Sequence, residues 1–186
     1  MKSKLRFISN FIKNPKEVAA ISTSSRYTIN KIIENIDFEN AACIVEYGPG
    51  VGTITKEILE NMNSDAKLIC FELNQEFCKH LSDSLKDPRL VVVNDTVENL
   101  DFHLKKLKIK NIDYAFSGIP FSLIKEKNKK IIVRKTRDYL RDGGKFIVYQ
   151  YSTHMKKYLR IYFNKVSINF EPRNLPPIFI MVCEKI

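Results

Sequence analysis

The chain has 186 residues, which suits one domain that buries about 70% of its unfolded surface without a disulfide scaffold. Its formal net charge of +10 favours an anionic partner, either nucleic acid or an acidic membrane surface. No apolar stretch approaches the roughly 20 residues that span a bilayer, and the N-terminus lacks a signal-peptide pattern, so we expect a protein that is neither transmembrane nor secreted.

The basic residues and the cysteines refine this picture. The basic residues form clusters, which indicate either an anion-binding surface or a lysine-rich solubilising one, and they do not separate RNA phosphates from lipid phosphates. The four cysteines show no Cys-x-x-Cys pair, so we expect buried free thiols and a reducing cytoplasm. The basic clusters are Lys2, Lys4, Arg6, Lys13 and Lys16, then 105–110, then 125–130, and finally Lys156, Lys157 and Arg160.

The first forty residues predict an N-terminal helical segment, and residues 41–186 the main domain. Apolar residues recur at helical spacing from Leu5 to Ile12 among basic ones, and Asn14-Pro15 marks a helix boundary. Such a helix suits a membrane interface, or alternatively docks on the domain by the same apolar face. The hydroxyls between Ser22 and Ser25 can cap a helix that starts near Tyr27, or contact a cofactor or an anion.

From residue 41 onwards, apolar runs alternate with helical patterns. They predict strands near 42–47, 66–72, 90–94, 112–117 and 145–151, with helices near 53–62, 74–86 and 123–140. This βαβ series implies an α/β fold in which helices cover both faces of a parallel sheet. Val166 to Phe170 and Ile178 to Cys183 lack a strong crossover-helix pattern between them, so we expect an antiparallel hairpin at the sheet edge.

A glycine-rich turn, Glu46-Tyr47-Gly48-Pro49-Gly50-Val51-Gly52, joins the first strand to the first helix of this series. Its three glycines allow a sharp turn and leave room for a ligand against the N–H groups at the helix start. The next strand ends at Glu72, about 20 residues after Gly52, where a carboxylate can accept hydrogen bonds from ribose hydroxyls. The pattern predicts a nucleotide-like cofactor.

The third and fourth strands end in Asn94-Asp95-Thr96 and in Ser117-Gly118-Ile119-Pro120-Phe121. In an open α/β sheet the ligand lies at the carboxyl ends of the strands, so we expect both segments to meet the glycine turn. Asp95 can accept a hydrogen bond from an adenine amino group, or alternatively cap a helix before Val97.

The Gly-x-Gly-x-Gly spacing, with Glu46 two places before the first glycine, resembles motif I of the class I S-adenosylmethionine methyltransferases. The chain as a whole resembles the bacterial phospholipid N-methyltransferases of the small, ribosomal RNA dimethylase-like type. The further matching pieces are Asn14-Pro15, Ala20-Ile21, Ser24-Ser25-Arg26, Glu72-Leu73-Asn74, Ser117-Gly118-Ile119-Pro120, Gly143-Gly144-Lys145-Phe146, the strand that ends at Tyr151, and Asn174-Leu175-Pro176-Pro177.

This resemblance implies one compact unit with a Rossmann-like seven-stranded sheet, mostly parallel with a C-terminal antiparallel hairpin, plus N-terminal helices. It implies methyl transfer from S-adenosylmethionine, which becomes S-adenosylhomocysteine, to the amine of phosphatidylethanolamine, with no metal. The expected partners are an anionic membrane surface and its phospholipid, and the expected location is cytoplasmic, peripheral on the inner face of the membrane.

The resemblance and the strand ends together assign roles to individual residues. Tyr151 and Ser117 are the catalytic candidates, with Tyr151 accepting a proton from the substrate ammonium through water. Tyr149 and Tyr151 can hold a methylated ammonium by cation–π contact, unless Tyr149 only packs across strands. The substrate candidates are Arg26, Tyr27, Phe121, Tyr149 and Tyr151. The cofactor candidates are Ser24, Ser25, Glu46, Gly48, Pro49, Gly50, Gly52, Glu72, Leu73, Asn94, Asp95, Thr96, Ser117, Gly118, Ile119 and Pro120.

Two other functions stay open. One is RNA adenine N6-methylation, which the basic charge suits, with Phe121 stacking on a splayed base. Against it, such enzymes usually carry Asn or Asp where this chain has Ser117, and RNA dimethylases of this type continue into a helical domain that we do not find. The other is a non-catalytic module that binds S-adenosylmethionine or a membrane surface.

Overall fold

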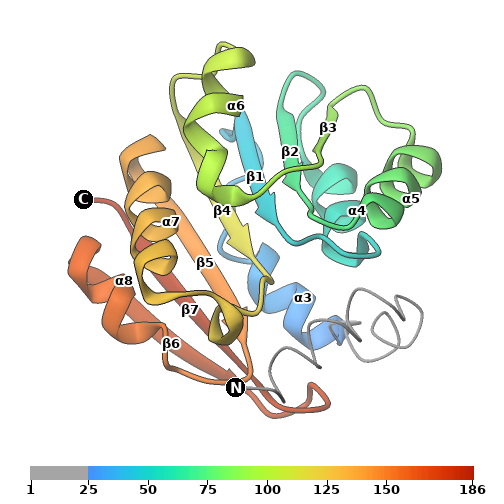
Figure 1. Cartoon of the computed structure of the whole chain (residues 1–186). Helices are drawn as coiled ribbons and strands as arrows, with labels where there is room; N and C mark the ends of the chain where they lie inside the picture. The colour runs from blue at the N-terminus through green and yellow to red at the C-terminus, as the bar shows by residue number, and fades with distance from the viewer. Residues whose placement is uncertain (1–24) are drawn as a thin grey trace.

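The computed structural model describes residues 25–186 and has a central seven-stranded sheet (Figure 1). The strands lie in the order β3-β2-β1-β4-β5-β7-β6. Their bounds are β1 (Cys43–Tyr47), β2 (Lys67–Phe71), β3 (Leu90–Val93), β4 (Ile112–Ser117), β5 (Leu140–Gln150), β6 (Lys165–Glu171) and β7 (Ile178–Glu184). The helices are α3 (Arg26–Ile33), α4 (Thr53–Asn61), α5 (Gln75–Leu85), α6 (Leu100–Lys106), α7 (Glu126–Tyr139) and α8 (Lys156–Tyr162), with short 3₁₀ turns η1 (Val97–Asn99) and η2 (Phe121–Leu123).

The strand directions confirm the expected fold class. β1 to β5 pair in parallel, whereas β7 runs antiparallel to both β5 and β6. The predicted hairpin is therefore present, with β7 inside the sheet and β6 at its edge. Because β6 runs in the same direction as β1 to β5, these six strands all end at one edge, which we call the carboxyl edge. It lies towards the bottom of Figure 1.

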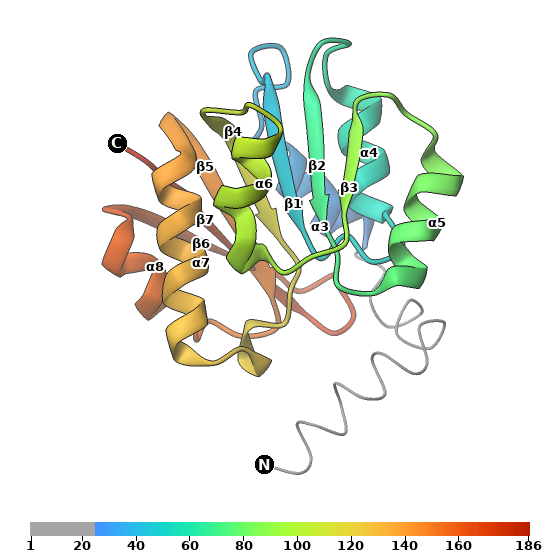
Figure 2. The same cartoon turned by 45° about the horizontal axis from the view of Figure 1, so that its top comes forward.

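Two apolar cores lie on opposite faces of the sheet. Alternate residues of β1 supply them, since Val45 faces one core and Ile44 the other. The first core packs beneath α6, α7 and α8, and the second beneath α3 and α4. Figure 2 shows α6 and α7 in front of the sheet and α3 behind it. All four cysteines are buried and free, as expected.

The structure differs from the prediction at several element boundaries. Helices α6 and α8 were not expected, because each has only seven residues and buries two of them. The helix expected from residue 123 begins at Glu126, since Ile124 and Lys125 have extended backbone angles. Strand β5 begins at Leu140 rather than near 145, with a register shift against β4 at its start.

Helix α3 starts near the expected residue, and Ser25 caps it. The Ser25 hydroxyl accepts a hydrogen bond from the Thr28 N–H at 3.3 Å. The predicted amphipathic helix, the Asn14-Pro15 boundary and Ser24 lie outside the described residues. Within residues 25–186, no helix is long and apolar enough to span a bilayer.

Candidate cofactor and acceptor site at the carboxyl edge

The glycine turn after β1 is built from left-handed backbone. Gly48, Gly50 and Gly52 have φ angles of +70°, +57° and +84°. A Cβ on Gly48 would lie 2.7 Å from Ile119 Cγ2, and one on Gly52 would lie 2.6 Å from Leu81 Cδ2. A Cβ on Gly50 would meet no heavy atom within 4 Å. The outer glycines therefore permit close packing, whereas Gly50 faces open space that a ligand can occupy.

Glu46 brings a buried carboxyl group beneath this turn. Its side chain is fully buried, and Oε2 accepts hydrogen bonds from Thr55 Oγ1 at 2.7 Å and from Cys70 Sγ at 3.6 Å. Oε1 has no hydrogen-bond partner among the described residues. Burial raises the pKa of Glu46 to about 7. An unpaired buried carboxylate fits a cofactor that carries an ammonium group, as the methionine part of S-adenosylmethionine does.

Glu72 lies beside Gly50 and is held by backbone groups. Its Oε2 accepts a hydrogen bond from the Gly50 N–H at 3.2 Å, and its Oε1 accepts one from the Asn74 N–H at 2.9 Å. Asn94 Nδ2 donates to the carbonyl oxygens of Glu72 and Leu73, which ties the ends of β2 and β3 together. The acid and the glycine turn thus meet as the spacing predicted, in a position that fits a ribose.

Asp95 is bound by three neighbouring residues. It accepts hydrogen bonds from the Thr96 N–H, from Asn99 Nδ2 on both oxygens, and from His103 Nε2 at 2.7 Å. The bond to His103 holds the pKa of Asp95 below its ordinary value. The side chain is still 31% exposed, so the adenine contact stays a prediction. The capping alternative for Asp95 is wrong, because Thr96 caps η1 by accepting the Glu98 N–H.

Ser117 and Gly118 end β4 in tightly packed surroundings. Ser117 is fully buried, and its Oγ has no hydrogen-bond partner among the described residues. A Cβ on Gly118 would lie 2.5 Å from the hydroxyl oxygen of Tyr149, so only glycine lets that ring lie across the strand end. Burial raises the pKa of Tyr149 well above its ordinary value. This geometry supports the packing alternative for Tyr149.

The structure changes the expected roles of two substrate candidates, Phe121 and Tyr151. Phe121 is fully buried in the core beneath α7, so its ring cannot stack on a substrate in this structure, and we correct that expectation. Tyr151 lies just beyond β5 and is 51% exposed. Partial desolvation raises the pKa of Tyr151, so its phenol keeps its proton at neutral pH and is a poor proton acceptor.

Arg26 and Tyr27 lie at the exposed start of α3, next to the β6–β7 loop, which we define as Pro172–Pro177. The Arg173 guanidinium carbon lies 4.0 Å from the centroid of the Tyr27 ring. Asn174 Oδ1 accepts hydrogen bonds from the Ser25 N–H at 2.8 Å and from the Thr28 hydroxyl at 2.9 Å. These contacts join the start of α3 to the β6–β7 loop rather than to the glycine turn.

Several residues at this edge escaped the sequence reasoning. Thr55 and Cys70 hold Glu46, and the alternation of β2 could have placed Cys70 beside it. His103 could not have been found, because α6 was not expected. Gln150 has a buried Nε2 without a hydrogen-bond partner among the described residues. The pattern Asn-Leu-Pro-Pro marks this loop in the sequence, but no sequence signal indicates that Asn174 joins the loop to α3.

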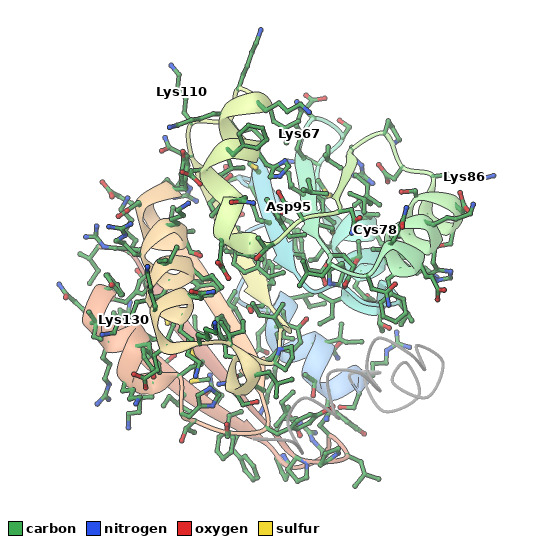
Figure 3. The ribbon with its side chains drawn as sticks, viewed as in Figure 1. Lys67, Cys78, Lys86, Asp95, Lys110 and Lys130 are labelled. Atoms are coloured by element: carbon green, nitrogen blue, oxygen red, sulfur yellow. The ribbon has the colours of Figure 1, made fainter. Side chains whose placement is uncertain are left out.

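The basic clusters do not all face this site. Figure 3 shows Lys110 and Lys67 at the far end of the molecule from the carboxyl edge, and Lys130 pointing outward from α7. The cluster at 105–110 precedes β4, so it lies at the opposite edge of the sheet. In the described part of the chain, no group of three or more His, Cys, Asp or Glu side chains could hold a metal ion.

Comparisons with known proteins agree with this architecture. A family model described as ribosomal RNA adenine dimethylase matches residues 1–134. The chain is similar to an ornithine lipid N-methyltransferase from Singulisphaera acidiphila, with 29% identity over 98% of this chain and 96% of the relative. It is also similar to ribosomal RNA small subunit methyltransferase A from Mycoplasmopsis synoviae, with 29% identity over 58% of this chain and 47% of that enzyme.

Solved structures share the fold at low identity. A precorrin-6y C5,15-methyltransferase from Geobacter metallireducens has a TM-score of 0.72 at 14% identity, over 89% of this chain and 91% of that one. The N-methyltransferase NodS from Bradyrhizobium japonicum, in complex with S-adenosyl-l-homocysteine, has a TM-score of 0.68 at 7% identity, over 86% of each chain.

Proposed function

The chain belongs to the ribosomal RNA adenine dimethylase family, which makes it an S-adenosylmethionine-dependent methyltransferase, and from that premise we propose that it methylates the amine of a membrane lipid head group. Phosphatidylethanolamine and ornithine lipid both offer a primary amine. The proposed place of action is the inner face of the cytoplasmic membrane, where the protein binds peripherally.

The observation that carries the lipid proposal is the extent of one alignment. The chain matches the ornithine lipid N-methyltransferase along nearly the whole length of both proteins. By contrast, it matches less than half the length of the Mycoplasmopsis synoviae ribosomal RNA enzyme. An alignment along nearly the whole length of both proteins supports a shared class of substrate more strongly than an alignment over less than half of the relative does.

The geometry of the glycine turn supports cofactor binding by this chain. Glu46 offers an unpaired buried carboxylate oxygen to the cofactor's ammonium group, Gly50 leaves open space, and Glu72 is held in position for the ribose hydroxyls. When bound, S-adenosylmethionine supplies an electrophilic methyl group on a positively charged sulfur. The protein then mainly needs to align the acceptor nitrogen with that methyl group, so little acid–base machinery is required.

Tyr151 is the proposed contact for the acceptor amine. Tyr151 is exposed at the end of β5 and keeps its phenol proton, so we assign it to cation–π and hydrogen-bond contact with the head-group amine rather than to proton removal. The amine gives up its proton to water before it attacks. Ser117 is fully buried, so we do not assign it to the acceptor amine.

RNA adenine methylation stays the second candidate, because ribosomal RNA enzymes are among the relatives and the net charge is +10. Two side chains, Phe121 and Ser117, make RNA adenine methylation the weaker candidate. Phe121 is buried and offers no face to a splayed base. Ser117 supplies a hydroxyl where exocyclic-amine methyltransferases usually supply a side-chain carbonyl.

The experiment is a methyl-transfer assay on vesicles. Purified protein and labelled S-adenosylmethionine are incubated with phosphatidylglycerol vesicles that contain either phosphatidylethanolamine or ornithine lipid, and the extracted lipids are separated by chromatography. We expect methylated derivatives of at least one amine lipid and no label in phosphatidylglycerol alone. Absence of label from both amine lipids would contradict the proposal.

A further inference from the structure

Exposed apolar side chains gather at the carboxyl edge. Leu175, in the β6–β7 loop, is 90% exposed, and the neighbouring Phe170 and Tyr27 are each 50% exposed. Tyr151, where β5 ends, is exposed as well, whereas Leu73 is exposed at the end of β2, on the other side of β1, β4 and β5. A scattered exposed apolar residue needs no explanation, but a group of them around one edge marks an interaction surface.

Hydrogen bonds of Asn174 fix the β6–β7 loop against α3. Asn174 is 3% exposed, and besides its bonds to Ser25 and Thr28 it donates from Nδ2 to the Pro176 carbonyl oxygen at 2.7 Å. The next residue, Leu175, is the most exposed large apolar residue of the described chain. The loop presents Leu175 and the two prolines that follow it on a hydrogen-bonded support.

The base of the loop carries excess positive charge. Glu171 is fully buried and accepts hydrogen bonds from Arg173 at 2.7 and 2.8 Å, and Lys31 lies 3.1 Å from the same carboxylate. These contacts hold the pKa of Glu171 far below its ordinary value. One carboxylate thus faces two cations, and the exposed Arg26 adds a third. An exposed leucine next to a group of cations matches a membrane interface, in which acyl chains lie next to negatively charged phosphates.

We propose that the β6–β7 loop inserts into the interface of an anionic phospholipid bilayer, with Leu175 in the acyl boundary and the cationic base at the level of the lipid phosphates. This inference rests on the proposed function and adds to it a membrane contact made by described residues. It seats the carboxyl edge, where β4 and β5 end, against the head groups that carry the acceptor amine.

The absence of tryptophan from the chain permits a direct test. Leu175→Trp creates a single reporter in the loop, and Ile161→Trp creates a matched reporter on α8, at a residue that is 58% exposed. With phosphatidylglycerol vesicles, the emission of the loop reporter should shift to shorter wavelength and be quenched by brominated acyl chains, while the α8 reporter stays unchanged. Equal behaviour of both reporters would overturn the proposal, as would a concentration-dependent shift without vesicles, which would indicate self-association.

A second pair of variants separates this inference from the proposed function. Leu175→Asp should weaken vesicle binding and methyl transfer to vesicle lipid by roughly tenfold, because a buried leucine contributes about that much to partitioning. Ile161→Asp should change neither quantity. Transfer to a short-chain amine lipid dissolved below its micelle concentration should be equal in both variants and the wild type. Normal transfer of vesicle lipid by Leu175→Asp overturns the loop proposal, whereas no transfer by the wild type to either lipid form overturns the function.

Discussion

Glu46 combines full burial with a carboxylate oxygen that lacks a partner among the described residues. Such a group destabilises the protein when it is ionised and has no ligand. Its pKa is raised from 4.5 to about 7, so the folded protein retains a proton at Glu46 that the unfolded chain has already released. Stability therefore falls as the pH rises from 4.5 to 7, and a cationic ligand can recover this loss.

The first prediction concerns this pH dependence. Between pH 5 and pH 8 the free energy of unfolding of the wild type should fall, relative to that of Glu46→Gln, by about 2.5 kcal/mol. The remaining ionisable groups are common to both proteins and cancel in the comparison. Urea denaturation at several pH values measures the difference. Parallel curves for the two proteins would show that Glu46 titrates in its ordinary range.

The same residue predicts how the cofactor affinity depends on pH. Below pH 7 the affinity of the wild type for S-adenosylmethionine should fall by up to about tenfold per pH unit, because Glu46 becomes neutral and loses its attraction for the ammonium group. Glu46→Gln should bind weakly at every pH. Calorimetric titrations measure both affinities, and a pH-independent wild-type affinity would remove Glu46 from the cofactor site.

Gly50 offers a second residue-scale test with an internal control. Gly50→Ala places a methyl group in the open space beside Glu72, so it should weaken S-adenosylmethionine binding strongly. Gly143→Ala has a comparable left-handed angle, φ +75°, and a Cβ there would meet only an arginine nitrogen at 3.5 Å. Both variants should lose about 1–2 kcal/mol of stability, but only Gly50→Ala should lose cofactor affinity. Unchanged affinity in Gly50→Ala would contradict our placement of the cofactor.

For individual residues, the sequence predicted the place in the fold better than it predicted the hydrogen-bond and packing partners. The left-handed glycines and the meeting of Glu72 with Gly50 followed from spacing alone, because strand ends in a parallel sheet share an edge. Asp95 and Phe121 were placed at the correct strand ends, but the contact of Asp95 with His103 and the burial of Phe121 were not predicted. Their surroundings depend on α6 and on a core beneath α7, and tertiary packing of this kind leaves no local pattern.

Among the elements, α3 and the β6–β7 loop form one unit through Asn174. Replacing Asn174 by Ala removes three hydrogen bonds and leaves the Ser25 N–H and the Thr28 hydroxyl without this partner. We expect a loss of about 2–4 kcal/mol and faster hydrogen exchange in α3. Asn169→Ala, an exposed position on β6, should change neither quantity. Equal stability of the two variants would mean that the loop does not brace α3.

Element prediction succeeded where the apolar period was long and failed where it was short. The strands of the parallel sheet and the final hairpin have apolar runs that identify them. Helices α6 and α8 have seven residues each, and their few buried side chains are surrounded by lysines, so no helical period emerges. The start of α7 was displaced because the sequence does not reveal the separate turn η2.

For the whole molecule, we assign both the cofactor and the acceptor to one edge of the sheet. The glycine turn, Glu72, the end of β4 and the β6–β7 loop all lie there, while the basic cluster at 105–110 lies at the opposite edge. A high net charge alone therefore does not identify an RNA-binding face. The full-length similarity to a lipid N-methyltransferase and the apolar loop both favour a membrane substrate.

The most direct test of this account is a competition in one tube. The full chain is incubated with radiolabelled S-adenosylmethionine together with phosphatidylglycerol vesicles that contain phosphatidylethanolamine and ornithine lipid, and with total bacterial RNA, after which lipid and nucleic acid are separated and counted. We predict label in methylated lipid head groups and none above background in RNA. Label in RNA with unlabelled lipid would contradict the central claim and make this chain a nucleic-acid methyltransferase.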